Sequence, residues 1–431
     1  MKRDAPTALI ALSLRASPRS LRIAVVTETW PPEVNGVAMS MARIVEGLRA
    51  RHHDLQLIRP RQGSGDSQYG ASHEQVLTGS WPVPRYPHLR MGVPSKAALV
   101  QLWALRRPDV VHIATEGPLG WSALQAARRL QLPVTSDFRT NFHAYGQHYG
   151  IGWLAKPILA YLRKFHNRAS CTMVPTEALR SDLAARGFER LHVVGRGVDT
   201  RQFDPAKRNA ALRSAWGAGD DALVLAYVGR LAAEKNLDAV LAAFEALRAK
   251  RSHTKLLFVG DGPLRDTLRA RCPQAIFAGH RSGDDLAAHY ASADVFLFPS
   301  LTETFGNVTT EAMASGLPVV AFDSAAAGQL IAHGRNGLLA SGTDLPAFVS
   351  AALPLAHDAA LRASLGAAAR ETACRIDWRS VVIRFESIVS QVIDSGSQAL
   401  MLDPAHARVG RAASRGARRE LQIAQEADAC V

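Results

Sequence analysis

Short apolar runs alternate with amphipathic stretches along most of the chain. In the first half, runs that indicate buried strands begin at Arg22, Leu55, Asp109, Leu132 and Cys171. Between them, stretches such as AMSMARIVEGLRAR and GWSALQAARRL carry apolar residues at helical spacing. Because strands that are apolar at nearly every position are buried on both faces, the pattern predicts a doubly wound α/β domain with a parallel sheet between two helical layers.

A second series of the same kind follows Pro205. Its strands are expected to begin at Leu223, Lys255, Ala275, Asp294 and Leu317. The segment GRGVDTRQFDPAKR (195–208) between the two series is aperiodic and holds glycine and proline, which is typical of a linker. A chain of 431 residues also exceeds the usual size of a single core. We therefore expect two Rossmann-like domains around a cleft, with ligands at the carboxyl ends of the strands.

The expected domain boundaries follow from these series. They are an N-terminal domain over 21–197, a linker over 198–205, a C-terminal domain over 206–377 and a last helix over 378–394. The tails 1–20 and 395–431 are expected to be disordered. A basic start and a short apolar stretch in the first tail resemble a signal peptide, but Arg15 and Arg19 follow at once and no small-residue cleavage site is present.

Cysteine content and charge narrow the class of protein. The four cysteines form no close pair, so neither a disulfide framework nor a zinc site is indicated, and a cytoplasmic location fits. Residues 1–200 hold 26 Lys and Arg against 14 Asp and Glu, whereas residues 201–400 hold 20 of each. The basic half is either a solvated surface or a face that meets an anionic partner such as a membrane. Without an RNP motif or helix-turn-helix spacing, nucleic acid is not the expected partner.

Three motifs follow predicted strands. Asn35-Gly36 opens a helix, where backbone amides and the helix dipole favour a phosphate, although a plain structural turn explains the glycine equally well. In YVGRLAAEKNLD, Arg230 and Lys235 follow a strand and are able to clamp a diphosphate, unless they form only a solvated pair. In TETFGNVTTEAMASGLP, Glu303 lies in a loop and Glu311 on the following helix, so the two carboxylates are placed to reach different parts of one ligand.

The motifs together resemble a known family. GRLAAEKNLD, FVGDGPL and ETFGNVTTEAMASGLPVVA resemble the C-terminal domain of the family-4 retaining glycosyltransferases of GT-B fold, whose signature is two glutamates separated by seven residues. PPEVNGVAMS and GVDTRQFDP resemble the glycine loop and interdomain linker of that family. The resemblance covers residues 22–394. Through YGIGWLAKPILAYLRKFHNRA it is nearest to sulfoquinovosyl- and mannosyltransferases that act on glycerolipids or phosphoinositides.

The resemblance implies roles for the charged residues. Glu303 would bind the hydroxyl groups of the donor hexose, and Glu311 the nucleotide ribose. Arg230 and Lys235 would hold the diphosphate and stabilise it as it departs. No D-x-D motif occurs in the chain, so the resemblance implies transfer without a metal or other cofactor, from a UDP- or GDP-linked sugar.

The uncharged motif residues receive roles in the same way. Gly36 would let the N-terminal loop close on the donor. Backbone amides of the turn Phe305-Gly306-Asn307 would contact sugar and phosphate oxygens. The resemblance also implies that the last helix packs back on the first domain.

The chain departs from the family after the fourth strand. Related members often carry FHT there, whereas this chain has DFRTNFHAYGQHYG, with Arg139 at the histidine position. Arg139 and His143 are therefore both candidates for the group near the reacting centre, with His148 a further one. The alternative for His143 and His148 is a hydrogen-bonded role in the scaffold.

A membrane-contact site is the remaining hypothesis. The segment WLAKPILAYLRKFHNR mixes apolar and aromatic residues with basic ones, as interfacial helices do. The contact residues expected from it are Trp153, Lys156, Arg163, Lys164 and Arg168. A lipid acceptor and a peripheral position at the inner face of the membrane would follow.

Several alternatives remain open at this stage. They are a soluble polysaccharide acceptor, a sugar-nucleotide epimerase or phosphorylase on the same fold, and more distantly a basic nucleic-acid-binding protein. No short motif encodes the base, the sugar, the linkage position or the oligomeric state.

Overall fold

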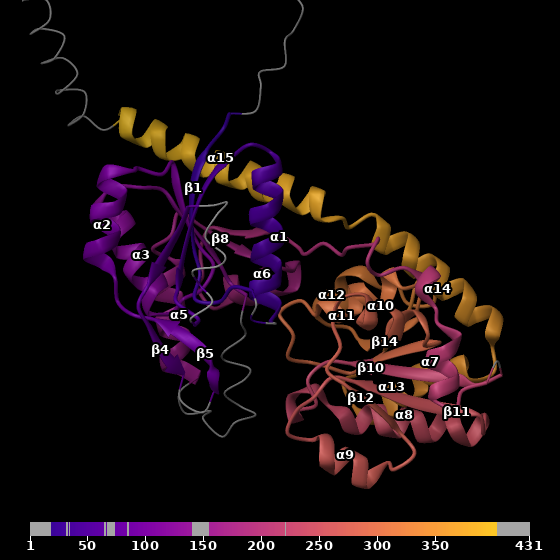
Figure 1. Cartoon of the computed structure of the whole chain (residues 1–431). Coiled ribbons are helices and arrows are strands. Elements are labelled where there is room, and N and C mark those ends of the chain that lie inside the picture. The colour runs from indigo at the N-terminus through magenta and orange to yellow at the C-terminus, as the bar shows by residue number, and fades with distance from the viewer. Residues whose placement is uncertain are drawn as a thin grey trace, which may run out of the picture.

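Two parallel β-sheets, one in each half of the chain, organise the computed structural model of the protein (Figure 1). The structure describes residues 19–31, 33, 35–63, 66, 74–83, 86–139, 155–219 and 221–402. Each sheet and its helices form an α/β domain of the kind that the apolar pattern predicts.

The first sheet is seven-stranded, in the order β3-β2-β1-β6-β7-β8-β9, and all its neighbours are parallel. Its strands are β1 (Arg22–Val26), β2 (Asp54–Pro60), β3 (Glu74–Thr78), β6 (Val110–Ile113), β7 (Val134–Asp137), β8 (Cys171–Val174) and β9 (Leu191–Val193). Its helices are α1 (Gly36–Ala50), α2 (Lys96–Leu105), α3 (Pro118–Arg129), α5 (Ala155–His166) and α6 (Glu177–Ala185). Every strand expected in this half is present.

Strands that the apolar pattern does not predict lie at the periphery. β3 and β9 are the two edges of the sheet, and β4 (Ser80–Val83) and β5 (Tyr86–Gly92) form a separate antiparallel pair. An edge strand is covered on fewer sides, so it needs no continuous apolar run. The three residues of β9 are accordingly only partly buried.

Alternate residues of β1 show how the sheet is packed on both faces. Ile23 and Val25 belong to a cluster with α1 and α15 (Trp378–Leu402), whereas Ala24 and Val26 belong to a cluster with α2 and α3. Side chains of a strand alternate between the two faces, so both faces of a central strand must be apolar. This packing explains the unbroken run RIAVV.

The second sheet is six-stranded and parallel, in the order β12-β11-β10-β13-β14-β15, and one large apolar cluster surrounds it. Its strands are β10 (Leu223–Val228), β11 (Thr254–Val259), β12 (Ile276–Gly279), β13 (Val295–Phe298), β14 (Val319–Phe322) and β15 (Leu338–Ala340). Its helices are α7 (Ala210–Ala215), α8 (Leu237–Lys250), α9 (Arg265–Arg271), α10 (Gly283–Ala291), α11 (Asn307–Ala314), α12 (Ala325–Leu330), α13 (Leu345–Ala352) and α14 (Ala359–Cys374), with the 3₁₀ turns Pro205–Lys207, Ala233–Lys235 and Leu353–Ala356. Only β15, another short edge strand, was not expected.

Helix α15 connects the two halves, running from the second half back along the first (Figure 1). Phe385 and Val389 are buried against α1 and the first sheet, and a Cβ on Gly47 of α1 would lie 2.4 Å from Val382 Cγ2. The predicted start of the disordered tail at residue 395 is wrong. The helix continues to Leu402, since no proline that would end it earlier occurs between Ile393 and Leu402.

No helix within the described ranges is long and apolar enough to cross a lipid bilayer.

Candidate active site

The motif residues gather at the carboxyl ends of β10 and β13. These strands are neighbours, and the chain leaves them toward opposite sides of the sheet, which makes this the switch point where ligands bind in such folds. Arg230 follows β10, and Glu303 lies in the loop between β13 and α11. The sequence-predicted placement of Glu303 in a loop and Glu311 on a helix is therefore observed.

The two cations of the β10 loop are both engaged by acidic residues. Arg230 Nη2 lies 2.6 Å from Glu234 Oε1, and the Arg230 side chain is 41% exposed. Lys235 Nζ donates to Glu303 Oε1, and both of those side chains are largely buried. The sequence predicted a pair of cations for a diphosphate. The structure adds that each has a carboxylate partner, which an incoming anionic ligand would have to share.

Glu303 is held from two sides. Besides Lys235, its Oε1 accepts a hydrogen bond of 3.0 Å from Ser300 Oγ. The next turn depends on Gly306, whose φ of +88° lies in the left-handed region that favours glycine. Phe305 is buried, and Asn307 begins α11. The carboxylate is thus fixed beside the amino end of a helix, where an oxygen-rich ligand finds both an acceptor and backbone donors.

Glu311 occupies a different environment from Glu303. Its Oε2 accepts a 3.0 Å hydrogen bond from the hydroxyl of Tyr290, a fully buried residue of α10. Burial raises the pKa of Glu311 to about 7, and the bond from Tyr290 offsets this only in part. No cation among the described residues pairs with this carboxyl group, and a carboxyl group in such a place is suited to the neutral hydroxyl groups of a sugar ring.

This pKa has a consequence for stability. The folded protein binds the Glu311 proton more tightly than the unfolded chain does, so the contribution of this group to stability is present below pH 4.5 and is lost as pH rises to about 7. A shift of the pKa from 4.5 to about 7 corresponds to about 3 kcal/mol in the free energy of unfolding. This is an upper limit, because Glu311 is partly accessible to solvent, which screens the effect. In chemical denaturation, wild type should lose more stability than Glu311→Gln between pH 5 and pH 8. Glu371→Gln, at an exposed position, is the control and should lose as much stability as wild type. Equal losses in wild type and Glu311→Gln would contradict the raised pKa of Glu311.

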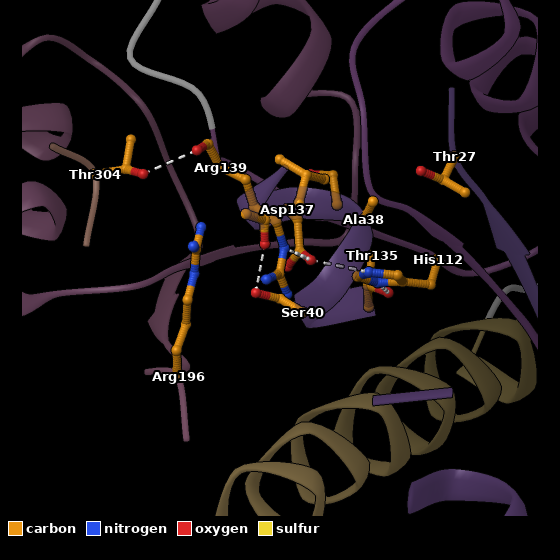
Figure 2. Close-up of polar contacts among 12 residues, drawn as sticks. Thr27, Ala38, Ser40, His112, Thr135, Asp137, Arg139, Arg196 and Thr304 are labelled. Carbon is orange, nitrogen blue, oxygen red and sulfur yellow. Dashed lines mark hydrogen bonds and ion pairs between the residues drawn. The ribbon is translucent and has the colours of Figure 1, made fainter. Parts of the chain in front are cut away.

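Arg139 lies at the end of a buried chain of polar contacts (Figure 2). His112 bonds to Thr135 Oγ1 at 2.9 Å and to Asp137 Oδ2 at 3.2 Å, and Arg139 Nε donates to the same Asp137 oxygen. Burial alone would raise the pKa of Asp137, but the charges of Arg139 and His112 outweigh it and hold the pKa at about 2. The Arg139 guanidinium is therefore committed to a carboxylate. Its backbone carbonyl accepts a 2.9 Å bond from Thr304 Oγ1 of the other half.

Arg196 also belongs to the site, although the sequence analysis assigns it no role. It is 6% exposed, its Nη1 donates to Asn307 Oδ1 at 3.2 Å, and its guanidinium carbon lies 5.8 Å from the centre of the Phe305 ring. The available signal was an arginine between two glycines, Gly195 and Gly197, in an aperiodic segment just after the last strand of a sheet.

Gly36 allows a close approach between the two halves of the protein. A Cβ at this position would lie 3.1 Å from Arg196 Nη1 and 3.9 Å from Asn307 Nδ2, so the missing side chain allows the start of α1 to approach the start of α11. Two of the backbone amides at the start of α1, which the sequence predicts to face a phosphate, already donate hydrogen bonds within the protein. Val37 N and Ala38 N both donate to Asn35 Oδ1.

The proposed membrane helix uses its apolar side internally. Leu162 and Phe165 of α5 are buried in the first domain, whereas Lys156, Arg163 and Lys164 are exposed. Just after the helix, the exposed Arg168 stacks over the Trp121 ring at 5.4 Å. The exposed side of the helix therefore carries these basic residues together with Tyr161, which is 40% exposed, whereas Leu162 and Phe165 are covered by the protein itself.

Some predicted residues lie outside the described part of the chain. These are His143, His148 and Trp153. Within the described part, no group of three or more His, Cys, Asp or Glu residues is arranged to hold a metal ion.

Comparisons with known proteins place the chain in a family. Residues 34–202 match the family model described as Glycosyltransferase Family 4, and residues 222–358 match Glycosyl transferases group 1. A GDP-mannose-dependent alpha-mannosyltransferase of Mycolicibacterium smegmatis is 37% identical over 83% of this chain and 94% of its own length. The chain belongs to the group 1 and family 4 glycosyltransferases.

The family assignment agrees with the resemblance found in the sequence. The sulfoquinovosyl transferase SQD2 of Arabidopsis thaliana is 30% identical over 85% of this chain and 72% of its own length. Among solved structures, Anabaena HepE, in complex with UDP and glucose, superposes with a TM-score of 0.68 at 19% identity, covering 86% of this glycosyltransferase and 99% of HepE. The predicted GT-B fold is confirmed.

Proposed function

We propose that this glycosyltransferase moves a hexose from a nucleoside-diphosphate sugar to a lipid acceptor, with retention at the anomeric carbon and without a metal ion. One observation carries the proposal. Lys235 and Glu303 meet beside Arg230 and the turn 305–307, so cationic groups for a diphosphate and a carboxylate for sugar hydroxyls stand together at the switch point.

The relatives support a choice of donor. Mannosyltransferases named as GDP-mannose-dependent cover most of this chain at 33–39% identity, so GDP-mannose is the first donor to test. Glu311, with its raised pKa and its Tyr290 contact, would receive the ribose, and Glu303 the hexose hydroxyl groups.

The chemistry proposed for the site needs no protein nucleophile. The bond from the anomeric carbon to the phosphate oxygen breaks, and a bond to the acceptor oxygen forms on the same face of the sugar. The acceptor proton passes to the departing phosphate. Arg230 and Lys235 neutralise the charge that develops on the diphosphate, and the buried ion pair with Asp137 fixes Arg139 at the end of β7.

Binding of the donor tests the proposed function most directly. In thermal unfolding, GDP-mannose and GDP should raise the melting temperature in a concentration-dependent manner, because a ligand that binds only the folded state stabilises it by mass action. UDP-glucose and UDP serve as the comparison pair. If none of the four ligands raised the melting temperature, nucleotide-sugar transfer would not be the activity of this site.

Chelation tests the absence of a metal requirement. Transfer should continue in EDTA, because the positive charge opposite the diphosphate would come from Arg230 and Lys235. The measurement is turnover of GDP-mannose before and after EDTA and after added Mg²⁺ or Mn²⁺. Loss on chelation with recovery on addition of metal would contradict this prediction.

A lipid acceptor would bring the enzyme to the cytoplasmic face of a membrane. The support is the surplus of basic residues in 1–200 and the exposed Lys156, Arg163 and Lys164 of α5. Each Lys or Arg at an anionic surface contributes about 1 kcal/mol, which salt screens. Since Leu162 and Phe165 of α5 pack internally, the attraction should be mainly electrostatic.

Vesicle binding should therefore depend on charge. We expect co-sedimentation with anionic vesicles, little with zwitterionic ones, and release as salt rises. Arg163→Glu with Lys164→Glu should weaken the binding and leave hydrolysis of the donor in solution unchanged. Arg248→Glu with Lys250→Glu, an exposed pair in the second domain, is the matched control. A soluble polysaccharide acceptor predicts no vesicle binding at any salt concentration.

A further inference from the structure

Arg196 is a buried cation whose charge is poorly compensated. The residue is 6% exposed, and its Nε is buried with no hydrogen-bond partner in the described structure. Its identified contacts are an amide oxygen of Asn307 and the face of Phe305, and neither carries a negative charge. Burial and the nearby charge of Arg139 lower the pKa of Arg196 to about 9. An arginine normally stays charged far above this pH, and the direction of the shift agrees with burial of the charge away from a close counter-ion.

The carboxylates in the neighbourhood are already in use. Asp137 bonds to Arg139 and His112, and Glu303 bonds to Lys235 and Ser300. Both act on Arg196 only at longer range. A buried ion without a close counter-ion is expensive, and proteins keep one where a ligand supplies the opposite charge.

The surroundings of Arg196 define what that ligand is. The guanidinium contacts Asn307 at the start of α11 and would be 3.1 Å from a Cβ on Gly36 at the start of α1. The amino ends of two helices carry partial positive charge, and the guanidinium of Arg139, although paired with Asp137, lies close enough to lower the pKa of Arg196. Figure 2 shows Arg196 extending toward Arg139 and Thr304, on the side where the two halves meet. This group of positive charges matches anionic phosphate oxygens.

We propose that Arg196 binds the diphosphate of the donor from the N-terminal side of the cleft, opposite Arg230 and Lys235. The inference rests on the proposed function, because it assigns a further residue to the same ligand. It adds that both halves of the protein, and not only the second domain, hold the diphosphate. Nε, which has no hydrogen-bond partner among the described residues, would donate to a phosphate oxygen.

The test is calorimetry with GDP, UDP and the nucleosides guanosine and uridine on the full chain. Arg196→Met should bind whichever diphosphate wild type binds at least about tenfold more weakly, because a charge-assisted hydrogen bond is lost. Binding of the nucleoside should not change. Arg201→Met, which removes an exposed arginine from the same linker, is the control and should bind as wild type does.

A stability measurement separates this role from a structural one. Without ligand, Arg196→Met should melt at the same temperature as wild type or higher, because it removes an uncompensated buried charge. A structural arginine would show the reverse, with a lower melting temperature and unchanged affinity. Arg196→Lys keeps the charge and should retain part of the affinity, which guards against a misfolded methionine variant.

The remaining outcomes are distinguishable. If wild type bound neither GDP nor UDP, the proposed function itself would fail. If wild type bound one of them and Arg196→Met bound it equally well, only this inference would fail. Unchanged diphosphate affinity with reduced transfer to phosphatidylinositol vesicles would assign the anion to a phospholipid headgroup and would overturn the assignment to the donor.

Discussion

Turnover should fall by about 10²–10³-fold when Lys235 is replaced by alanine, while the protein stays folded. The ammonium group is largely buried beside Glu303, at the end of the β10 loop where the diphosphate is proposed to leave. A fixed cation in a partly dry site stabilises charge that develops in the transition state without reorganising. Steady-state kinetics with the donor should show a loss in kcat larger than the rise in KM.

Arg230→Ala should show a loss of the same order, for the same reason. Matched controls exist for both positions. Lys207→Ala removes a lysine that pairs with Asp284 at 2.6 Å, and Arg265→Ala removes a partly exposed arginine that pairs with Asp261 at 3.1 Å. Both controls should keep near wild-type turnover. Turnover close to wild type in Lys235→Ala and Arg230→Ala would show that this loop does not hold the departing group.

The two glutamates should lose different functions when each is replaced. Glu303→Ala should reduce discrimination between GDP-mannose and GDP-glucose, because its carboxylate is placed for hexose hydroxyl groups. Glu311→Ala should weaken binding of free GDP, because its partner would be the ribose. Each lost charge-assisted hydrogen bond is worth roughly 1.5–3 kcal/mol, which is about 10–150-fold in affinity.

The contacts of the two residues support this separation. Glu303 pairs with Lys235 and Ser300 in the loop, whereas Glu311 bonds to Tyr290 beneath the helix. Calorimetry with GDP alone isolates the nucleotide, and competition between the two GDP-sugars isolates the hexose. An equal loss of GDP affinity in both variants would mean that the two carboxylates act as one structural unit.

Much of the fold was predictable because its signal is local. A central parallel strand must be apolar on both faces, so runs such as RIAVV and LVLAYV are recognisable without any knowledge of their partners. The site motifs were also local, since each immediately follows one of these strands. The loop position of Glu303 and the helical position of Glu311 followed from the turn Phe305-Gly306-Asn307 between them.

The peripheral elements were less predictable. β3, β9 and β15 lie at sheet edges, and the pair β4–β5 stands apart, so none of them requires a continuous apolar run. The surroundings of α5 were also not predictable, for a related reason. An amphipathic pattern shows that a helix has an apolar side, but only the packing of Leu162 and Phe165 shows that this side is covered by the protein itself.

The sequence by itself determined the two sheets, the switch point and the charged residues placed there, because these depend on periodicity and on neighbours along the chain. Only the tertiary structure decided how the charges are partnered. The contacts of Lys235 with Glu303 and of Arg196 with Asn307 join residues 68 and 111 positions apart. The importance of Arg196 arises from burial without a nearby anion. Arg196 becomes buried only when the linker, α1 and α11 pack together, so the sequence pattern does not predict it.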